Sequence, residues 1–324
     1  MKAGHRCVRS QTSSMLPLVS AIIPAFNREA TIARSVRSAL SQTYGNLEVI
    51  VVDDGSSDGT VNALAPFDGR IVVLRQANGG PSLARNLGAS KARGAILAFL
   101  DSDDEWLPDK IEKQVRMMLA YGPGMPCCVC NAAYSDGSEA PARTSFGLAG
   151  LAPPFEGAIL ENPVDLLTST FLLFNQVAAI RRDAFEQVGG YNERLRLLED
   201  YDLSLRLATL GPWGVLSEPL VLKDDDTGGI GVTAMKDELK HLAAQEAVLE
   251  CILATPILQR DAIRKPITAK LRRARRLRSL HRWMLNAPRP QRLAGRTLLL
   301  LDRIGQALAR RVPGAKSRVR LREA

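Results

Sequence analysis

Long apolar segments are missing from this chain of 324 residues. No apolar run approaches the ~18–20 residues that are needed to cross a bilayer. The N-terminal stretch "MKAGHRCVRSQTSSMLPLVSAIIP" lacks a separate apolar core followed by a small-residue cleavage site, so we expect no signal peptide. The hydrophobic fraction of 46% still suffices for a buried core, which excludes a largely disordered chain.

Cysteine is also scarce, with five residues, three of which lie together in "PCCVC". Five cysteines are too few for the disulfide framework of a chain this long. A metal site at Cys127, Cys128 and Cys130 would need a second pair of ligands, and Cys7 and Cys251 are remote in the sequence. We interpret the three as small apolar residues of a buried strand, and the composition favours the reducing cytoplasm.

Two common nucleotide-binding signatures are absent. No G-x-G-x-x-G follows the first predicted strand, and no G-x-x-x-x-G-K-[ST] occurs anywhere. The glycines of "TGGIGVTAM" lie late in the chain, without a preceding strand of the required type. An ordinary dinucleotide site and a P-loop are therefore excluded.

The net charge of +9 is distributed unevenly. Residues 260–324 contain 20 basic and 3 acidic residues, a net charge of +17, whereas the preceding 259 residues contain 23 basic and 31 acidic residues, a net charge of −8. An acidic body with a basic tail indicates that the two parts meet different partners.

The first hundred residues alternate between strand and helix patterns, which predicts an α/β domain with a mainly parallel sheet. Each predicted strand is a short run rich in Val, Ile and Leu, as expected of buried parallel strands. The strands are "LVSAIIPAF", "LEVIVVDD", "RIVVLRQ" and "AILAFLD", and helical patterns follow them at 29–42, 58–67, 79–94 and 108–120.

Polar or glycine-rich residues follow all four predicted strands, as "PAFN", "DDGSSDG", "QANGG" and "DSDDE". Parallel sheets bind ligands beyond the carboxyl ends of their strands. We therefore expect a ligand site at this edge.

Four of the five residues from Asp101 to Glu105 are acidic. In an extended segment, Asp101 and Asp103 would point the same way on either side of Ser102. Two carboxylates projected together suit Mg²⁺ or Mn²⁺, which would neutralise a diphosphate. The alternative is a solvated acidic turn that caps the helix after Pro108.

The order and spacing of these motifs resemble those of the family 2 glycosyltransferases of the GT-A fold. The similarity covers roughly residues 17–215 and is carried by "VSAIIPAFNREATIARSVRSALSQTYGNLEVIVVDDGSSDGT", "NGGPSLARNLGASKARGAILAFLDSDDEWLPDK" and "VAAIRRDAFEQVGGYNERLRLLEDYDLSLRLATLG". It implies a GT-A nucleotide-sugar-binding domain at 17–228, between an N-terminal extension at 1–16 and a helical basic C-terminal region at 229–324.

The resemblance also implies an activity, namely metal-dependent, inverting transfer of one sugar from a UDP-, GDP- or dTDP-sugar to an acceptor hydroxyl. The setting would be the synthesis of cell-surface polysaccharide or lipid-linked glycan. A sugar nucleotidyltransferase is an alternative, but "PAFNREA" lacks the Gly-rich basic loop that such enzymes carry after the first strand. A catalytically degenerate fold that binds a membrane surface is disfavoured by the intact Asp54, Asp103 and Asp200.

Donor-binding residues follow from the resemblance. The nucleotide base is expected at Pro24, Ala25, Phe26 and Glu29. Base and ribose are expected at Asp53 and Asp54, although Asp54 also fits a turn residue of "DDGS". Arg85 and Asn86 match residues that line the donor site, and a guanidinium suits a diphosphate; a solvated helix face is the alternative for Arg85.

Metal ligation and catalysis are implied by two further motifs. In "DSD", Asp103 is the expected direct ligand of Mn²⁺ or Mg²⁺, Asp101 is a second ligand that also reaches sugar or ribose hydroxyls, and Ser102 lies between them in the donor site. Asp200 of "LLEDYDLSLRL" matches the family's catalytic base, which takes the proton of the acceptor hydroxyl. Asp200 also fits the N-cap of its helix, and both roles are compatible.

Two departures from the family pattern stand out. Many relatives carry a His after the last strand, whereas "EPLVLKDDDTGGIGVT" has none and instead carries Asp224 to Asp226, which fit a surface loop or an addition to the metal site. The Q-x-x-R-W motif of processive synthases is absent, which favours addition of a single sugar.

The basic tail beyond residue 235 has helical patterns with apolar stripes among its arginines. Such helices suit an anionic membrane surface, with the enzyme peripheral at its cytoplasmic face. A helical bundle packed on the catalytic domain is the alternative. Nucleic-acid binding is not expected, because Trp283 is the only aromatic of the basic stretch.

Overall fold

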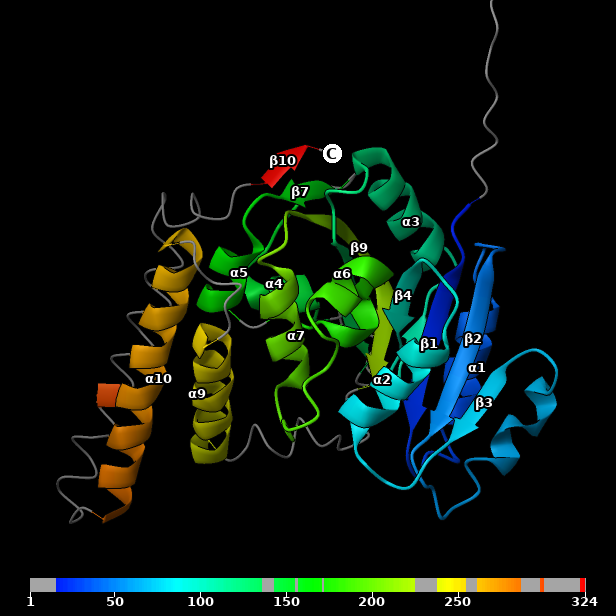
Figure 1. Ribbon diagram of the computed structural model, residues 1–324, viewed down its shortest axis with the longest axis horizontal. Coiled ribbons are helices and arrows are strands. Elements are labelled where there is room, and N and C mark those ends of the chain that lie inside the picture. Colours follow the sequence, from blue (N-terminus) through cyan, green and yellow to red (C-terminus); the bar gives the residue numbers. More distant parts are fainter. Residues whose placement is uncertain are drawn as a thin grey trace, which may run out of the picture.

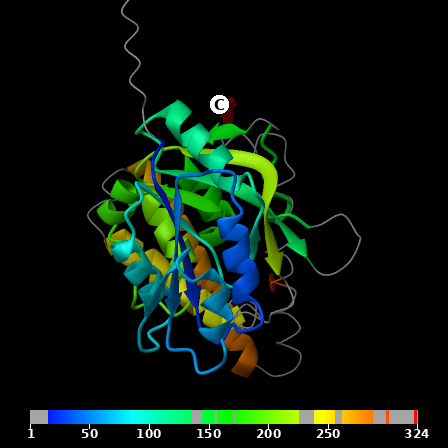
Figure 2. The same ribbon diagram turned by 90° about the vertical axis from the view of Figure 1, so that its right-hand side faces the viewer.

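The computed structural model describes residues 16–135, 143–154, 157–170, 172–224, 238–254, 261–286, 298–299 and 321–323. A sheet of ten strands forms the centre, in the order β10-β7-β9-β6-β8-β4-β1-β2-β3, with β5 paired to β9. Helices cover both faces of this sheet (Figure 1, Figure 2).

The four strands predicted from the first hundred residues form the parallel half of the sheet. They are β1 (Val19–Ala25), β2 (Leu47–Asp53), β3 (Val72–Arg75) and β4 (Ile96–Phe99). β1 lies at the centre of this half, with β2 and β4 parallel on its two sides and β3 beyond β2. The prediction that all four are buried is wrong for β3, because it is an edge strand whose Val72 and Val73 are 47% and 40% exposed.

The second half of the sheet introduces antiparallel pairs. Its strands are β5 (Glu105–Trp106), β6 (Cys127–Ser135), β7 (Ala158–Leu160), β8 (Ala178–Arg181), β9 (Trp213–Asp224) and β10 (Leu321–Glu323). β8 runs antiparallel between β4 and β6, whereas β6 and β9 are parallel. Cys127, Cys128 and Cys130 are buried in β6, which confirms their interpretation as core residues.

The helices of the first half follow the predicted pattern closely. They are α1 (Ile32–Leu40), the 3-10 helix η1 (Asn62–Phe67), α2 (Pro81–Lys91) and α3 (Lys110–Tyr121). Pro81, within the helical pattern predicted at 79–94, opens α2, since its fixed φ and missing N–H suit a first turn. α3 begins two residues after Pro108, because the Lys110 N–H first closes a turn onto the Leu107 carbonyl.

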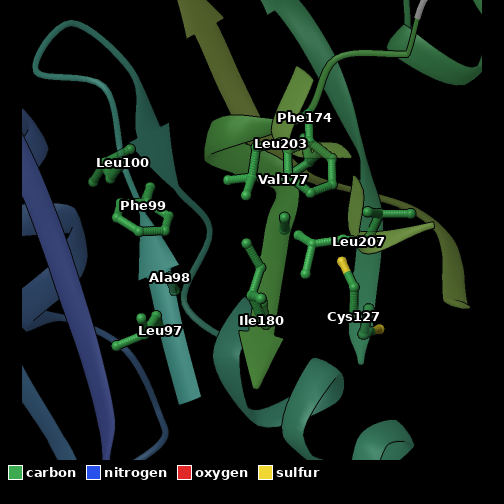
Figure 3. Packing of buried hydrophobic residues seen from close by; sticks show 14 of the residues in the cluster. Leu97, Ala98, Phe99, Leu100, Cys127, Phe174, Val177, Ile180, Leu203 and Leu207 are labelled. Carbon is green, nitrogen blue, oxygen red and sulfur yellow. The ribbon is translucent and has the colours of Figure 1, made fainter. Parts of the chain in front are cut away.

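The helices of the second half are shorter, and they carry the remaining site residues. They are α4 (Ser145–Ala149), α5 (Pro163–Ser169), η2 (Asn175–Val177), α6 (Arg182–Gln187) and α7 (Glu199–Leu207). Leu203 and Leu207 of α7 lie over Phe174 and Val177, next to Cys127 of β6 (Figure 3). This packing fixes α7 against the sheet and thereby fixes the position of the "ED" pair at its start.

Two long helices follow, α9 (Glu238–Ala254) and α10 (Asp261–Asn286), and they lie side by side at the edge of the molecule (Figure 1). α9 contacts α7, and α10 contacts both α9 and α5. Ile267, Leu271 and Ala274 form the buried face of α10. Within the part of the chain that the structure describes, no helix combines the length and apolarity of a membrane span.

Candidate active site

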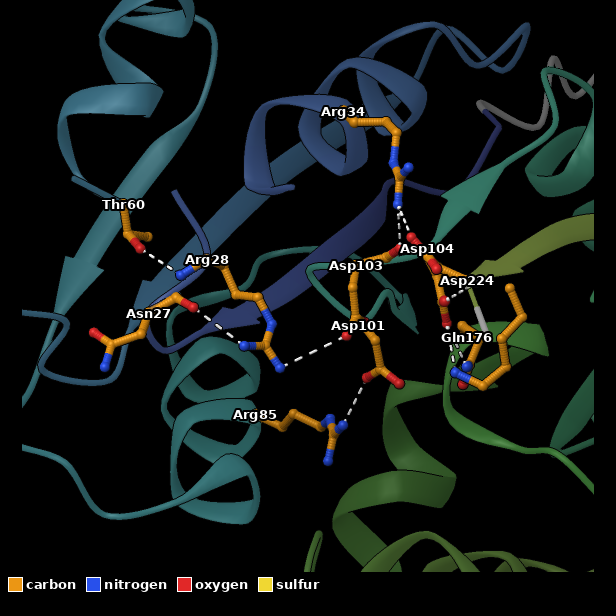
Figure 4. A network of polar contacts seen from close by, with 11 residues as sticks. Asn27, Arg28, Arg34, Thr60, Arg85, Asp101, Asp103, Asp104, Gln176 and Asp224 are labelled. Carbon is orange, nitrogen blue, oxygen red and sulfur yellow. Dashed lines mark hydrogen bonds and ion pairs between the residues drawn. The ribbon is translucent and has the colours of Figure 1, made fainter. Parts of the chain in front are cut away.

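The acidic turn comprises residues 101–105 and lies just beyond β4, at the carboxyl edge of the parallel strands. It is not the extended segment predicted from the sequence, because the Asp104 N–H donates to the Asp101 carbonyl at 3.1 Å and closes a turn. Glu105 then pairs with β9 as part of β5. The turn therefore joins the two halves of the sheet, and its carboxylates point in different directions (Figure 4).

Arg85 of α2 is held between two carboxylates. It donates to Asp101 Oδ1 at 2.7 Å and to Glu199 Oε1 at 3.0 Å, and its side chain is only 5% exposed. Burial alone would raise the pKa of Asp101, but the Arg85 guanidinium, with Lys223, outweighs it and holds that pKa below its usual value. The interpretation of Arg85 as a solvated helix face is wrong.

Asp103 faces two arginines of the first loop and helix. Its Oδ2 lies 3.6 Å from Arg28 Nη2, and its backbone carbonyl accepts from Arg34 Nη2 at 2.7 Å. Its side chain remains 13% exposed, and that of Asp101 25% exposed. Both carboxylates are thus accessible at one turn, with Ser102 buried between them.

A metal ion would find two acidic ligands here rather than a complete protein cage. Among the described residues, no group of three or more His, Cys, Asp or Glu side chains is arranged to hold a metal. Mg²⁺ and Mn²⁺ accept such partial sites when one or two carboxylates are joined by substrate phosphates and water. Asp101 and Asp103 fit a cation that arrives with a diphosphate.

Asp104 is fully buried and was not singled out by the sequence. Its Oδ2 accepts from Gln176 Nε2 at 2.5 Å and lies 3.4 Å from Lys223 Nζ, while its Oδ1 accepts from the Asp224 N–H at 3.0 Å. Burial raises the pKa of Asp104 to about 7, although Lys223 opposes the shift. Asp104 therefore ties β4 to η2 and to the end of β9 (Figure 4).

The two adjacent aspartates at the end of β2 have different partners. Asp53 is buried, and its Oδ2 accepts from Arg75 Nε at 3.0 Å. Asp54 accepts from Gln76 Nε2 at 2.7 Å and from the N–H groups of Gly79 and Gly80 at 2.9 and 2.8 Å. In this structure Asp54 anchors the glycine-rich loop that leads into α2.

The loop after β1 interlocks with the loop after β2. Pro24 and Ala25 are still within β1 and are buried, whereas Phe26 is 43% exposed at its end. The Asn27 N–H donates to Ser56 Oγ at 2.9 Å, and Glu29 Oε2 accepts from the Gly59 N–H at 2.8 Å. These bonds shape an edge at which the ring of Phe26 is presented to solvent.

Asn86 turns away from its neighbour Arg85. Its amide donates to the Tyr191 carbonyl at 2.9 Å and to Glu193 Oε1 at 2.8 Å, and it accepts from the Tyr191 N–H at 2.9 Å. A cavity of about 440 Å³ adjoins Asn86 and is also lined by Asp202 and parts of α9. No residue of the acidic turn lines it, so Asn86 lies beside a space separate from the carboxylate cluster.

Asp200 is the second residue of α7 and is half-buried. The N-cap is Leu198, held at a left-handed φ of 61°, so the prediction that Asp200 caps the helix is wrong. Its carboxylate instead accepts from the N–H of Tyr201 at 2.7 Å. Burial and the adjacent Glu199 carboxylate raise the pKa of Asp200 to about 7, which suits a base that works near neutral pH.

The acidic stretch after β9 is only partly described. Asp224 pairs with Arg34 at 2.7 Å and borders the acidic turn, whereas Asp225 and Asp226 lie outside the described residues. Lys223 and Glu199 were missed by the sequence reasoning. The signal for Glu199 was its place in the "ED" pair, and for Lys223 it was the missing His in the same stretch.

Comparison with known proteins shows that the chain is similar to glycosyltransferases. A profile described as Glycosyl transferase family 2 matches residues 20–189, just over half of the chain. An uncharacterized glycosyltransferase of Haemophilus influenzae is 32% identical over 198 residues, which is 59% of this chain and 62% of that protein. The Escherichia coli UDP-Glc:alpha-D-GlcNAc-diphosphoundecaprenol beta-1,3-glucosyltransferase WfgD is 47% identical over 104 residues, which is 32% of this chain and 41% of that protein.

Solved structures show the same fold at low sequence identity. S. aureus TarS 1-349 in complex with UDP-GlcNAc has a TM-score of 0.65 and 18% identity, covering 85% of this chain and 77% of that one. The mannosyltransferase PcManGT from Pyrobaculum calidifontis, in complex with GDP-Man and Mn²⁺, has a TM-score of 0.52 and 18% identity, covering 94% and 84%. The predicted GT-A fold with its helical C-terminal region is thereby confirmed.

Proposed function

The chain belongs to glycosyl transferase family 2, and on that premise we propose that it moves one sugar from a nucleotide-sugar to an acceptor hydroxyl, with inversion at the anomeric carbon. The observation that carries the proposal is the half-buried Asp200 beside the Arg85 bridge, with a pKa raised to about 7. The TarS structure holds UDP-GlcNAc and the PcManGT structure holds GDP-Man, which supports a nucleoside diphosphate as the leaving group.

In this mechanism Asp200 is the general base. Its carboxylate takes the proton of the acceptor hydroxyl while the hydroxyl oxygen attacks the anomeric carbon from the face opposite the diphosphate. The bond between the anomeric carbon and the phosphate oxygen breaks, and its electron pair leaves with the nucleoside diphosphate. One attack with one departure inverts the anomeric centre.

Asp103 and Asp101 are the residues that would hold Mn²⁺ or Mg²⁺. When bound, the ion would supply positive charge beside the diphosphate as that group departs. Arg28 and Arg85 hold one oxygen of each carboxylate and thereby orient both side chains. The PcManGT structure holds Mn²⁺ with its donor, which supports the same choice of ion here.

The donor base and ribose are proposed to bind beyond β1 and β2. Phe26 offers an exposed ring for stacking on a base, and Asp53 and Asp54 lie at the end of the neighbouring strand. A UDP-, GDP- or dTDP-sugar fits this proposal. The base is chosen by the surrounding pocket rather than by any of these residue types alone.

We test the donor with a thermal-shift screen of UDP-, GDP- and dTDP-sugars in Mn²⁺. At least one donor should raise the melting temperature with Mn²⁺ present and raise it less in EDTA. Asp103→Ala should remove the Mn²⁺ effect, whereas Asp68→Ala, which removes an exposed acid directly after η1, should keep it. Equal shifts in Mn²⁺ and EDTA would contradict the metal site.

The acceptor is proposed to be a lipid-linked glycan, reached by an enzyme that sits peripherally at the cytoplasmic face of a membrane. The WfgD relative acts on a diphosphoundecaprenol-linked sugar by its name. α10 contacts α9 and α5 and buries Ile267, Leu271 and Ala274. It exposes Arg264 and Arg272, and Trp283 is 45% exposed near its end. Arginines and an exposed indole suit an anionic leaflet.

Vesicle sedimentation tests the membrane contact. The protein should pellet with anionic vesicles at low salt and be released as salt rises, and Arg264→Ser/Arg272→Ser should weaken pelleting. Arg70→Ser/Arg116→Ser removes the same charge from exposed positions elsewhere and is the control. Equal loss in both double variants would mean that net charge alone drives binding, which contradicts a specific role of α10.

A further inference from the structure

Each of the four acids of the acidic turn pairs with a cation of the protein, although Arg85 is shared with Glu199 and Arg34 with Asp224. Arg85 pairs with Asp101 and Arg28 with Asp103. The remaining pairs, in the same order along the turn, are Lys223 with Asp104 and Arg34 with Glu105. Part of the positive charge beside these carboxylates is therefore supplied by side chains of the protein itself.

Lys223 differs from the three arginines because its partner, Asp104, already accepts hydrogen bonds from two other groups. Asp104 already accepts from Gln176 at 2.5 Å and from the Asp224 N–H at 3.0 Å, both shorter than the 3.4 Å to Lys223 Nζ. The Asp104 side chain is fully enclosed, whereas the Lys223 side chain is 21% exposed. The Lys223 ammonium is thus not required to satisfy Asp104, and it can interact with other negative groups nearby.

That charge extends to the candidate metal ligands. Lys223 Nζ lies 3.4 Å from Asp104 Oδ2, and Asp104 is the neighbour of Asp103 and is bonded through its N–H to the Asp101 carbonyl at 3.1 Å. A compact ammonium on a flexible stem can face several carboxylates without a fixed fork geometry. Lys223 therefore lies close enough to act electrostatically on whatever binds at Asp101 and Asp103.

Resting on the proposed function, we propose that Lys223 is a second cation of the donor site, which weakens binding of a divalent ion alone and strengthens binding of the diphosphate. The Lys223 ammonium already lies beside the turn, so it repels a divalent ion that enters by itself. A diphosphate brings the negative charge that both cations can share. Lys223 is a positioning residue in this role, since it acts through the charge of the turn.

The test uses Lys223→Met and measures two affinities of the full chain. Mn²⁺ without nucleotide is titrated by electron paramagnetic resonance, and UDP, GDP and dTDP are titrated one by one in EDTA by calorimetry. Loss of one neighbouring charge should tighten Mn²⁺ and weaken the best nucleotide in EDTA, each on the order of tenfold. Lys223→Arg keeps the charge and should keep both affinities.

Lys113→Met is the matched control, because Lys113 is ion-paired to Asp109 and Glu218 rather than to the turn. It should change neither affinity. The opposite signs for cation and anion separate the proposal from a structural role, since a damaged site would lose both. A parallel loss of both affinities in Lys223→Met, or no change in either, would overturn the inference.

The proposed function can fail separately. If the wild type binds none of the three nucleotides with Mn²⁺, the transferase proposal fails. The Mn²⁺ titration without nucleotide still judges Lys223, because tightening in Lys223→Met supports the inference and unchanged affinity refutes it.

Discussion

Two buried cations on different sides of the molecule have opposite surroundings. Arg85, at the carboxyl edge of the sheet, bridges Asp101 and Glu199. Lys110, the first residue of α3, is fully buried, donates to Gln114 Oε1 at 2.8 Å and lies 4.2 Å from the ring centre of Trp106. Among the described residues, no carboxylate forms an ion pair with Lys110.

The difference is that the charge of Arg85 is paired with two carboxylates, whereas the charge of Lys110 is buried without a counter-ion in the described part of the chain. Breaking a buried pair leaves an uncompensated charge and is strongly destabilising, whereas a buried charge without a counter-ion already reduces stability. Substitutions at the carboxyl edge of the sheet should therefore reduce turnover or stability, and removal of the Lys110 charge should increase stability.

The largest effect is expected at Asp200, the proposed general base. Asp200→Asn keeps the size of the side chain and its bond from the Tyr201 N–H but cannot accept the acceptor's proton, so turnover should fall roughly 10²–10⁴-fold. Steady-state kinetics measure this, with donor affinity unchanged. Asp183→Asn is the control, because Asp183 accepts the next N–H in the same way at the start of α6. A loss of stability with normal turnover would contradict the role of Asp200 as base.

Arg85→Met should have the next largest effect, because it leaves two carboxylates without their ion-pair partner. Asp101 and Glu199 keep some solvent contact, so we expect a loss of about 3 kcal/mol in unfolding free energy, at the lower end for a broken buried pair. Urea denaturation measures it. Arg116→Met removes an exposed pair with Glu112 and should cost less than about 1 kcal/mol. Equal costs would erase the distinction between the two surroundings.

Lys110→Met should have a smaller effect of the opposite sign. Burial lowers the pKa of Lys110 to about 8, so charging it at neutral pH costs stability, and its removal should gain about 2 kcal/mol after the bond to Gln114 is lost. Below pH 8 the penalty is fully present. It fades as pH rises toward the unfolded pKa, since the unfolded chain then binds more protons than the folded one.

The stability gap between Lys110→Met and wild type should therefore narrow from about pH 8 to pH 10. Burial also raises the pKa values of the thiols of β6. Both proteins contain these thiols, so their contribution to the pH dependence of stability drops out of the difference. A destabilised Lys110→Met at pH 7 would show that the amide and indole contacts outweigh the cost of burial.

The smallest effect should be a shift in the pH profile. Because Asp200 must be ionised to accept a proton, turnover should rise with pH through about 7. Glu199→Gln removes the adjacent negative charge that helps to raise this pKa, so the rise should move to lower pH. If the pH profile of turnover did not move in Glu199→Gln, Asp200 would not be the group that sets the pH dependence.

The local parts of the fold were predictable from the sequence because their signals are local. Runs of Val, Ile and Leu defined β1, β2 and β4, and the helical pattern at 79–94 located α2. β3 has the same composition, yet it is exposed, since nothing within its own residues reveals that it ends the sheet. The alternation of strands and helices thus predicted the parallel half, but not which strand lies at its edge.

The sequence by itself determined that acids and glycines would gather at one edge of an α/β sheet, because parallel strands all end there. The tertiary structure alone decided which charges meet. Arg85 and Glu199 are 114 residues apart, and Asp104 and Lys223 are 119 apart. Such pairings depend on the path of the whole chain through β8 and β9, and no periodicity within a segment encodes that path.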